Sequence, residues 1–198
     1  IAAHFMITND KAAARIQAKA QRRAIPAGTR ADAGARAAAL FMGAIPLPPA
    51  STVSAYWPLG DEFDSRPLLD ALLQSGHKAA LPVVVGADQP LIFRQWQPGD
   101  DMAVSSFGVS EPREAAGEVR PNVVVAPFLA FNAQGFRLGY GGGYYDRTLR
   151  TLRQSVPGLL AVGLGFELQE MATLPHDSND EPLDWLISEH HVRQFHRN

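Results

Sequence analysis

The sequence predicts an α/β fold: one domain in three layers, with an open, mostly parallel sheet and helices on both faces. Two continuous apolar runs of strand length, 122–126 and 159–166, are typical of parallel strands buried on both faces. Between them lie a glycine-rich turn and a helical segment, so these pieces form a βαβ unit. A length of 198 residues fits one domain. We expect a Rossmann-like domain over 1–198, with 1–8 and 190–198 as frayed tails.

Composition excludes several classes of protein. The formal net charge is −2, and no basic stripe alternates with aromatic residues, so we expect no nucleic-acid partner. The chain has no cysteine, which removes disulfides, thiolate catalysis and cysteine-based zinc sites. No apolar run approaches the roughly 18 residues that span a bilayer, so we expect no membrane partner. We therefore expect a cytoplasmic protein, and a monomer.

The first quarter of the chain is helical in character. Residues 10–24 are rich in good helix formers, and Thr8 or Asn9 can cap this first helix. A second helix is predicted over 29–43. We expect both helices to pack on the flank of the sheet.

The other elements follow from apolar runs that end at turn residues. In chain order they are strands at 51–57 and 79–85 with a helix at 66–75 between them, a strand at 91–96, a mostly irregular segment at 97–120 and a short strand at 185–188. Ser65 or Asp64 can cap the helix that begins at Arg66. The strand at 91–96 is expected to pair with its predecessor as a hairpin.

The most informative stretch is the glycine-rich turn at 137–147 and the start of its helix. Glycines let successive N–H groups point into one concavity, and the helix N-terminus adds its own donors, so the turn suits an anion. Arg137 supplies a fork of donors suited to phosphate. Asp146 is a candidate Mg²⁺ ligand, since this ion at phosphates takes one or two carboxylates. On spacing alone, a tight structural turn is an equal alternative.

The full string, Arg-Leu-Gly-Tyr-Gly-Gly-Gly-Tyr-Tyr-Asp-Arg, closely resembles the signature of the 5-formyltetrahydrofolate cyclo-ligase (methenyltetrahydrofolate synthetase) family. The resemblance runs from about Lys11 to Glu189, so it implies a single cyclo-ligase-like domain. It implies ATP and a reduced folate as small-molecule substrates and Mg²⁺ as cofactor. The positions that it assigns to ATP are Lys11, Arg15, Arg137, Leu138, Gly139, Tyr140, Gly141, Gly142, Gly143, Tyr144 and Tyr145.

Two cations of the first helix extend the resemblance. Lys11 and Arg15 are four residues apart, which puts them on one helix face. From spacing alone, a solvated face is the favoured interpretation. In the family, a Lys-x-x-x-Arg helix reaches the nucleotide and its arginine also approaches the folate. The resemblance therefore implies catalytic roles for Lys11 and Arg137.

The folate side rests on weaker matches. The loop after the strand at 51–57 carries Asp61 and Glu62, at the strand end where open α/β sheets bind ligands. The resemblance implies that Glu62 recognises the reduced pterin. The alternative is an acidic loop that only caps the following helix. Phe107 can stack on a planar ring, or can simply plug a long loop. The positions implied for substrate binding are Arg15, Trp57, Glu62, Phe107, Tyr140 and Tyr144.

The last segments bring a second carboxylate and several departures from the family pattern. The resemblance implies that Asp180 is a second carboxylate associated with Mg²⁺. The alternative is that this proline-rich loop contains only turn and cap residues. Asn179 replaces a common histidine, and Phe128 stands where glycine is common. Asn132 replaces a common aspartate, which would weaken charge balance near Mg²⁺. The histidines of 190–196 are read as part of a frayed tail.

The resemblance implies ATP-dependent cyclisation of 5-formyltetrahydrofolate to 5,10-methenyltetrahydrofolate, with release of ADP and phosphate. Two alternatives stay open. Asn132 and Asn179 favour a non-catalytic regulatory paralogue that binds nucleotide or folate. A sugar-phosphate isomerase of similar fold would need a carboxylate–histidine arrangement near the phosphate loop, and 137–147 holds no histidine. For the first reading, Arg137→Ala is expected to abolish most turnover while leaving the fold intact.

Overall fold

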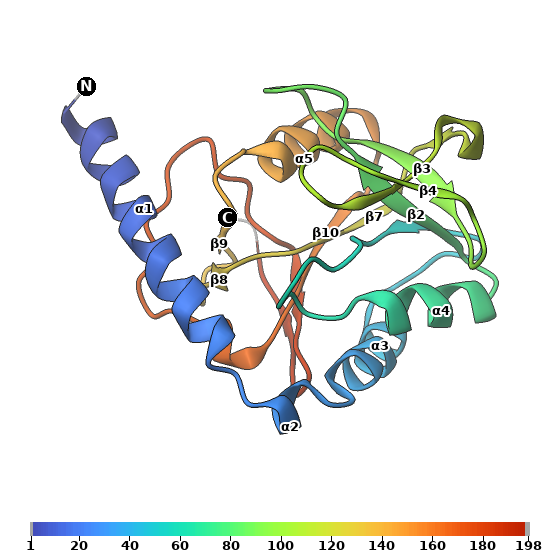
Figure 1. The fold of residues 1–198 in the computed structure, drawn as a ribbon, viewed down its shortest axis with the longest axis horizontal. Coiled ribbons are helices and arrows are strands. Elements are labelled where there is room, and N and C mark those ends of the chain that lie inside the picture. The colour runs from blue at the N-terminus through green and yellow to red at the C-terminus, as the bar shows by residue number, and fades with distance from the viewer. Residues whose placement is uncertain (1, 197–198) are drawn as a thin grey trace.

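The computed structural model describes residues 2–196, with side chains from Asp10 to His196. Within this part of the chain, the centre is an eight-stranded sheet in the order β12-β11-β10-β7-β1-β2-β3-β6 (Figure 1). Its five inner strands are parallel: β11 (Trp185–Ile187), β10 (Leu160–Leu164), β7 (Val123–Ala126), β1 (Thr52–Ser54) and β2 (Lys78–Val83). The antiparallel strands are β12 (Val192–Gln194), β3 (Ile92–Trp96) and β6 (Glu118–Val119). The predicted mostly parallel sheet and the β2–β3 hairpin are confirmed.

The predicted βαβ unit is present at the centre of the sheet. Strand β7 is followed by α5 (Tyr144–Ser155) and then by β10, which pairs parallel to β7 with Leu160 opposite Val123. Both strands are almost wholly buried, as their continuous apolar runs predict. The unit brings the glycine-rich turn to the carboxyl end of the innermost strand.

Each face of the sheet carries its own hydrophobic core, because successive side chains of a strand point to opposite sides. Val125 of β7 packs in the core of α3 (Ala33–Ala44) and α4 (Arg66–Gln74). Its neighbour Val124 packs in the core beneath α5, together with Leu149. Helices therefore cover both faces, and the three-layer prediction is confirmed.

Helix α1 (Ala2–Arg23) does not pack on the flank of the sheet as expected. Its Ala14 and Ala18, one turn apart, pack on the small hairpin of β8 (Ala130–Phe131) and β9 (Arg137–Leu138). Small side chains let the helix approach this hairpin closely. The helix also begins before Thr8 and Asn9, so neither is its cap, and 2–8 are helical rather than frayed.

Other boundaries differ from the sequence expectations for local reasons. The predicted helix at 29–43 is two helices, α2 (Ala27–Arg30) and α3, because Asp32 adopts a left-handed φ of 57° between them. The segment at 97–120 contains a hairpin, β4 (Met102–Val104) with β5 (Ser110–Pro112), then η1 (Glu114–Ala116) and β6. None of the helices described here is long and apolar enough to cross a membrane.

The C-terminal segment is not a frayed tail within the described residues. Strand β12 pairs antiparallel with β11, with Val192 opposite Ile187. Arg193 of β12 forms ion pairs with Glu167 and Glu170. Pairing at the edge of the sheet and these ion pairs hold this segment in place, although its sequence contains only short polar and histidine-rich runs.

The N-cap residue of α4 is Ser65, one of the two predicted candidates, but its side chain makes no capping hydrogen bond. The Asp64 carboxylate accepts the Arg66 N–H at 3.1 Å. The Ser65 hydroxyl instead donates to the carbonyl oxygen of Tyr56, so it ties the helix to the preceding loop.

Phe128, which stands where family members often have glycine, fits because two glycines of the neighbouring strand segment leave room for its ring. A Cβ at Gly165 would lie 2.4 Å from Cζ of Phe128, and a Cβ at Gly163 would lie 3.0 Å from its Cε1. Phe128 is only 2% exposed. The glycines are therefore required by close packing.

We predict that Gly165→Ala lowers the free energy of unfolding by about 1–3 kcal/mol, because its methyl group overpacks the core at Phe128. Gly43→Ala in α3 is the matched control, since nothing lies within 4 Å of its added Cβ. The control should equal or exceed wild-type stability. Chemical denaturation of the three proteins checks this, and equal midpoints for wild type and Gly165→Ala would contradict it.

Candidate active site

A cavity of about 870 Å³ lies at the carboxyl ends of the inner strands. Its wall includes Trp57 after β1, Val84 after β2 and Pro127 after β7. Open parallel sheets bind ligands at this edge, because the loops that leave neighbouring strands diverge there. Helix α1 and the β4–β5 hairpin contribute further walls through Lys11 and Phe107.

Every residue that the sequence analysis assigned to a site lines this one cavity. They come from α1, the loop after β1, the β4–β5 hairpin, the glycine-rich turn and the segment before β11. These residues are Lys11, Arg15, Trp57, Glu62, Phe107, Arg137, Leu138, Gly139, Tyr140, Gly141, Gly142, Gly143, Tyr144, Tyr145, Asp146 and Asp180. Their individual roles remain predictions.

The glycine-rich turn enters α5 through left-handed backbone. Gly143 is the N-cap residue with a φ of 65°, and Gly141 has a φ of 108°. Side chains at either position would be strained. A Cβ at Gly141 would also lie 3.4 Å from the guanidinium carbon of Arg15, whose Nε donates to the carbonyl of Gly139 at 3.0 Å. The turn is thus held open toward the cavity and close to α1.

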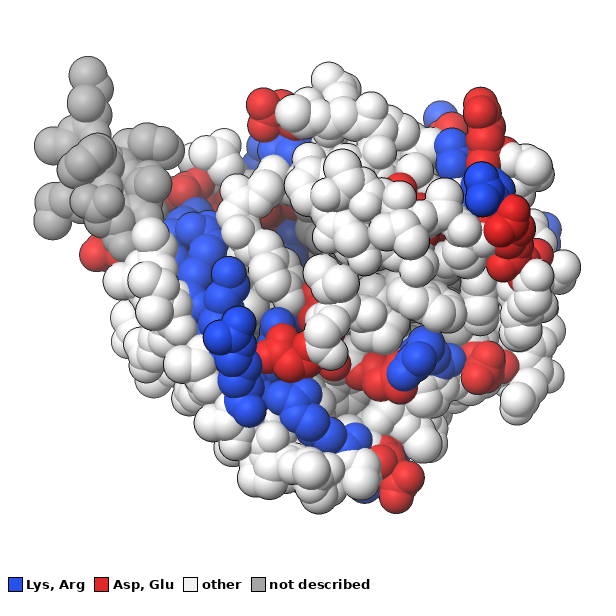
Figure 2. All heavy atoms as spheres, viewed as in Figure 1, with Lys and Arg blue, Asp and Glu red and all other residues white. Residues whose placement is uncertain are grey.

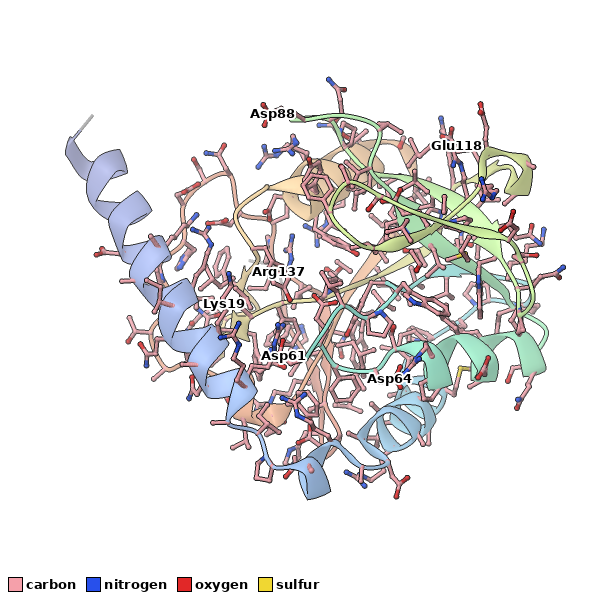
Figure 3. The ribbon with its side chains drawn as sticks, in the orientation of Figure 1. Lys19, Asp61, Asp64, Asp88, Glu118 and Arg137 are labelled. Atoms are coloured by element: carbon pink, nitrogen blue, oxygen red, sulfur yellow. The ribbon has the colours of Figure 1, made fainter. Side chains whose placement is uncertain are left out.

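Arg137 lies in the cavity wall rather than at a solvated mouth, and is 7% exposed. Its guanidinium donates to Oδ1 of Asp146 at 2.8 Å and to the carbonyl oxygen of Glu181 at 2.5 Å. Figure 3 shows Arg137 in the space between α1 and the sheet. Arg137→Ala would leave Asp146 and Glu181 without these bonds. The structure therefore predicts that this substitution lowers the stability of the protein, whereas the sequence predicted an intact fold.

Lys11 is also fixed before any ligand arrives. Its ammonium group donates to Oδ2 of Asp177 at 2.8 Å and to Oδ2 of Asp180 at 2.6 Å. Burial alone would lower the pKa of Lys11, but the two carboxylates outweigh it and raise the pKa. The side chain is therefore a permanently charged donor at the cavity wall.

Lys and Arg side chains run along α1 on the face shown in Figure 2, beside acidic residues. The helix carries Lys11, Arg15, Lys19 and Arg22 at spacings of three or four, which is one helix face. Arg22 was not identified from the sequence, although this spacing could have indicated it. It is 4% exposed, and its guanidinium donates to the hydroxyl of Tyr140 at 2.7 Å and to Asp61 at 2.5 Å.

Glu62 lies at the end of this chain of contacts. Its Oε1 accepts the hydroxyl of Tyr140 at 2.5 Å, and its Oε2 accepts the N–H of Leu59 at 2.9 Å. Burial raises the pKa of Glu62, while Tyr140, Leu59 and Arg22 oppose that rise. Burial also raises the pKa of Tyr140, so its hydroxyl stays a donor.

Comparison with known proteins agrees with this site. The family model of the 5-formyltetrahydrofolate cyclo-ligase family matches residues 7–189. The 5-formyltetrahydrofolate cyclo-ligase of Escherichia coli K12 is 30% identical over 175 residues, which cover 85% of this chain and 94% of that protein. This chain belongs to the 5-formyltetrahydrofolate cyclo-ligase family.

Further members give the same picture. The 5-formyltetrahydrofolate cyclo-ligase of Mycolicibacterium smegmatis is 37% identical over 136 residues, or 64% of this chain and 69% of that protein. The solved structure of Aquifex aeolicus 5,10-methenyltetrahydrofolate synthetase has a TM-score of 0.78 at 28% identity. It covers 95% of this chain and 94% of its own. The cyclo-ligase fold is therefore shared over nearly the whole chain.

Asp146 and Asp180 are the carboxylates that could hold Mg²⁺, and only with further ligands from outside the protein. Among the side chains that the structure describes, Asp10 to His196, no group of three or more His, Asp or Glu residues could hold a metal by itself. Asp146 and Asp180 both line the cavity, and the N–H of Glu181, next to Asp180, donates to Oδ1 of Asp146 at 3.1 Å. One or two carboxylates suffice for Mg²⁺ when phosphate oxygens and water complete its shell.

Two supporting arginines of α5, Arg150 and Arg153, were not identified from the sequence. Arg150 lines the cavity and donates to Glu181 at 3.0 Å and to the carbonyl oxygen of Asn179 at 2.9 Å. Arg153 donates to the other carboxylate oxygen of Glu181 at 2.6 Å. Both arginines follow Asp146 at helical spacing, which was the available signal. They hold the segment that carries Asp180 against α5.

Asn132 has a structural task away from the cavity lining. It is 2% exposed, and its side-chain oxygen accepts the N–H groups of Gln134 at 3.1 Å and Phe136 at 3.0 Å. These bonds close the β8–β9 turn. The expected weakening of charge balance near Mg²⁺ therefore has no geometric basis at Asn132.

We predict that Asn132→Asp leaves turnover within about twofold of wild type. An aspartate oxygen can accept the same two N–H groups, so the hydrogen bonds of the turn are kept. Asn132→Ala should lower the free energy of unfolding by about 1–3 kcal/mol, because two partly buried hydrogen bonds of the turn are lost. Thermal melts and steady-state assays of both variants check this. A large gain of turnover in Asn132→Asp would restore a charge role near the metal.

Proposed function

We propose that this chain converts 5-formyltetrahydrofolate and ATP to 5,10-methenyltetrahydrofolate, ADP and phosphate. The single observation that carries the proposal is the convergence on one cavity of a glycine-rich helix start, three cations and an acceptor carboxylate. Lys11, Arg15 and Arg137 supply the cations, and Glu62 supplies the acceptor. A phosphate donor and a reduced pterin need these two kinds of group side by side.

The chemical difficulty is that a formamide oxygen is a poor leaving group. The formyl oxygen attacks the γ-phosphorus of ATP, an O–P bond forms, and the bond to ADP breaks. The N10 lone pair then attacks the activated formyl carbon and closes the ring. Loss of the N10 proton and cleavage of the C–O bond to phosphate give the methenyl product. No covalent protein nucleophile is needed, which suits a cavity lined without cysteine.

The protein contributes position and charge to these steps. The N–H groups of the turn Gly139 to Gly143 and the start of α5 face phosphate oxygens. Lys11 and Arg137 stabilise the charge that moves from the γ-phosphate to ADP. Since their side chains are already held by carboxylates, little reorganisation is needed on binding.

Asp146 and Asp180 are the residues that would hold Mg²⁺. When bound with ATP, the ion supplies charge neutralisation at the phosphate oxygens. The two carboxylates are also partners of Arg137 and Lys11, so they keep these cations oriented toward the same phosphates. The same two carboxylates therefore serve both tasks, which are to hold Mg²⁺ and to orient the two cations.

Residues other than those assigned to phosphate and Mg²⁺ recognise the folate. Glu62 accepts pterin N–H donors, and Trp57, Phe107 and Tyr144 supply apolar and aromatic walls. Phe107 is 54% exposed and meets Tyr144 edge-on at a centroid distance of 6.0 Å. An exposed aromatic at the tip of the β4–β5 hairpin can close over a planar ring.

The direct test mixes the protein with 5-formyltetrahydrofolate and Mg-ATP and follows the ultraviolet absorbance of the methenyl product. We expect the absorbance to rise only when protein, folate and Mg-ATP are all present. Absence of turnover with folate or ATP binding retained in calorimetry would instead support a non-catalytic paralogue. Binding of neither ligand would overturn the proposal.

We predict that Lys11→Met lowers kcat/KM for ATP by about 10²-fold or more, because a charge-assisted contact to the transferring phosphate is lost. Lys78→Met is the matched control, since Lys78 is exposed at the start of β2 and does not line the cavity. It should keep the wild-type value. Steady-state kinetics with varied ATP at saturating folate check both variants, and equal values for both would remove Lys11 from the phosphate site.

A further inference from the structure

Arg22 is a buried cation that the proposed reaction does not use directly. It reaches from α1 to two loops that come from distant parts of the chain. One of its terminal nitrogens donates to the Tyr140 hydroxyl at 2.7 Å, and the other donates to Asp61 at 2.5 Å. Burial opposes the charge on Asp61, but Arg22 outweighs it and lowers the pKa of that carboxyl. Arg22 therefore stays ionised and fixed in place.

The bond from Arg22 gives the Tyr140 hydroxyl a single direction. A guanidinium can only donate, so the phenol oxygen is the acceptor of this bond. The hydroxyl proton is then left for Oε1 of Glu62, 2.5 Å away. The order of donation runs from Arg22 to Tyr140 to Glu62. Hydrogen bonds in such a chain strengthen one another.

Glu62 is held at both oxygens by this arrangement. Oε1 accepts the Tyr140 hydroxyl, and Oε2 accepts the N–H of Leu59 at 2.9 Å. Each carboxylate oxygen can accept a further bond. Since Glu62 lines the cavity, one acceptor position on each oxygen remains for a ligand with two parallel N–H donors. The 2-amino-4-oxopyrimidine ring of a folate has such a pair.

We propose that Arg22 and Tyr140 are positioning residues that orient the Glu62 carboxylate for bidentate recognition of the pterin ring. This inference rests on the proposed cyclo-ligase function and names how its folate site is set. Tyr140 belongs to the glycine-rich turn, so the same side chain joins the phosphate loop to the folate wall. Arg30 supports the anchor, because it donates to the carbonyl oxygens of Asp61 and Arg22.

The charged and titratable groups around Glu62 determine how the arrangement responds to pH. They come from α1, α2, the loop after β1 and the glycine-rich turn, and they are Lys19, Arg22, Arg30, Tyr56, Asp61, Tyr140 and Tyr145. Burial raises the pKa of Glu62, and the Tyr140 bond opposes the rise. Loss of that bond lets the pKa rise further, so the acid limit of folate binding should move to higher pH.

The experiment compares Tyr140→Phe, Arg22→Met and the control Arg23→Met with wild type. Arg23 is the exposed neighbour of Arg22 on α1. Calorimetry measures the Kd of 5-formyltetrahydrofolate without ATP between acid and neutral pH, and kinetics measure KM for each substrate. For Tyr140→Phe we expect a Kd about tenfold higher, an acid limb shifted to higher pH and a KM for ATP within about twofold of wild type. Arg22→Met should shift Kd in the same direction, and Arg23→Met should match wild type.

The outcomes separate this inference from the proposed function. If wild type turns over folate and Tyr140→Phe keeps the wild-type Kd and acid limb, the positioning role is wrong while the function stands. If Tyr140→Phe raises KM for ATP and leaves the folate Kd unchanged, Tyr140 serves the nucleotide instead. If wild type binds no folate, both proposals fall. Should Arg22→Met unfold, Tyr140→Phe still decides, because it removes only one hydroxyl.

Discussion

The site depends above all on the buried guanidinium of Arg137. It joins β9 to Asp146 in the first turn of α5 and to the backbone of Glu181, two segments that are far apart in the sequence. Arg150 and Arg153 bind the same Glu181 from α5. Together with the bond from the Glu181 N–H to Asp146, these contacts hold the loop that carries Asp180 against the start of α5. Lys11 then completes the enclosure, since it ties α1 to that loop.

This arrangement gives each of the buried or partly buried cations a carboxylate partner before any ligand is present. Lys11 has Asp177 and Asp180, Arg137 has Asp146, and Arg22 has Asp61. Charges taken partly out of water need such partners. The result is a set of fixed dipoles and charges, and preorganised groups of this kind need little rearrangement when charge moves in the proposed phosphoryl transfer.

Much of this was predictable from particular residues. Continuous apolar runs indicated β7 and β10, and the glycine-rich string indicated Arg137 and Asp146, which line one cavity near the start of α5. Their role in anion binding stays a prediction. The C-terminal strand was not predictable, because 190–196 has weak strand character and Val192 to Gln194 are held by pairing with β11 and by the ion pairs of Arg193. Asn132 was misjudged for a similar reason, since its role depends on a hairpin turn that only the folded chain forms.

Local sequence patterns were enough to indicate the glycine-rich turn, the buried strands and the side chains that share one face of α1. These properties follow from glycine conformation, hydrophobic period and helical spacing, all of which act over a few residues. Only the tertiary structure decided that α1 packs on the β8–β9 hairpin and not on the sheet, and that Arg22 meets Tyr140 and Asp61. Those contacts join residues many tens of positions apart, and their partners are selected by packing, which no local pattern records.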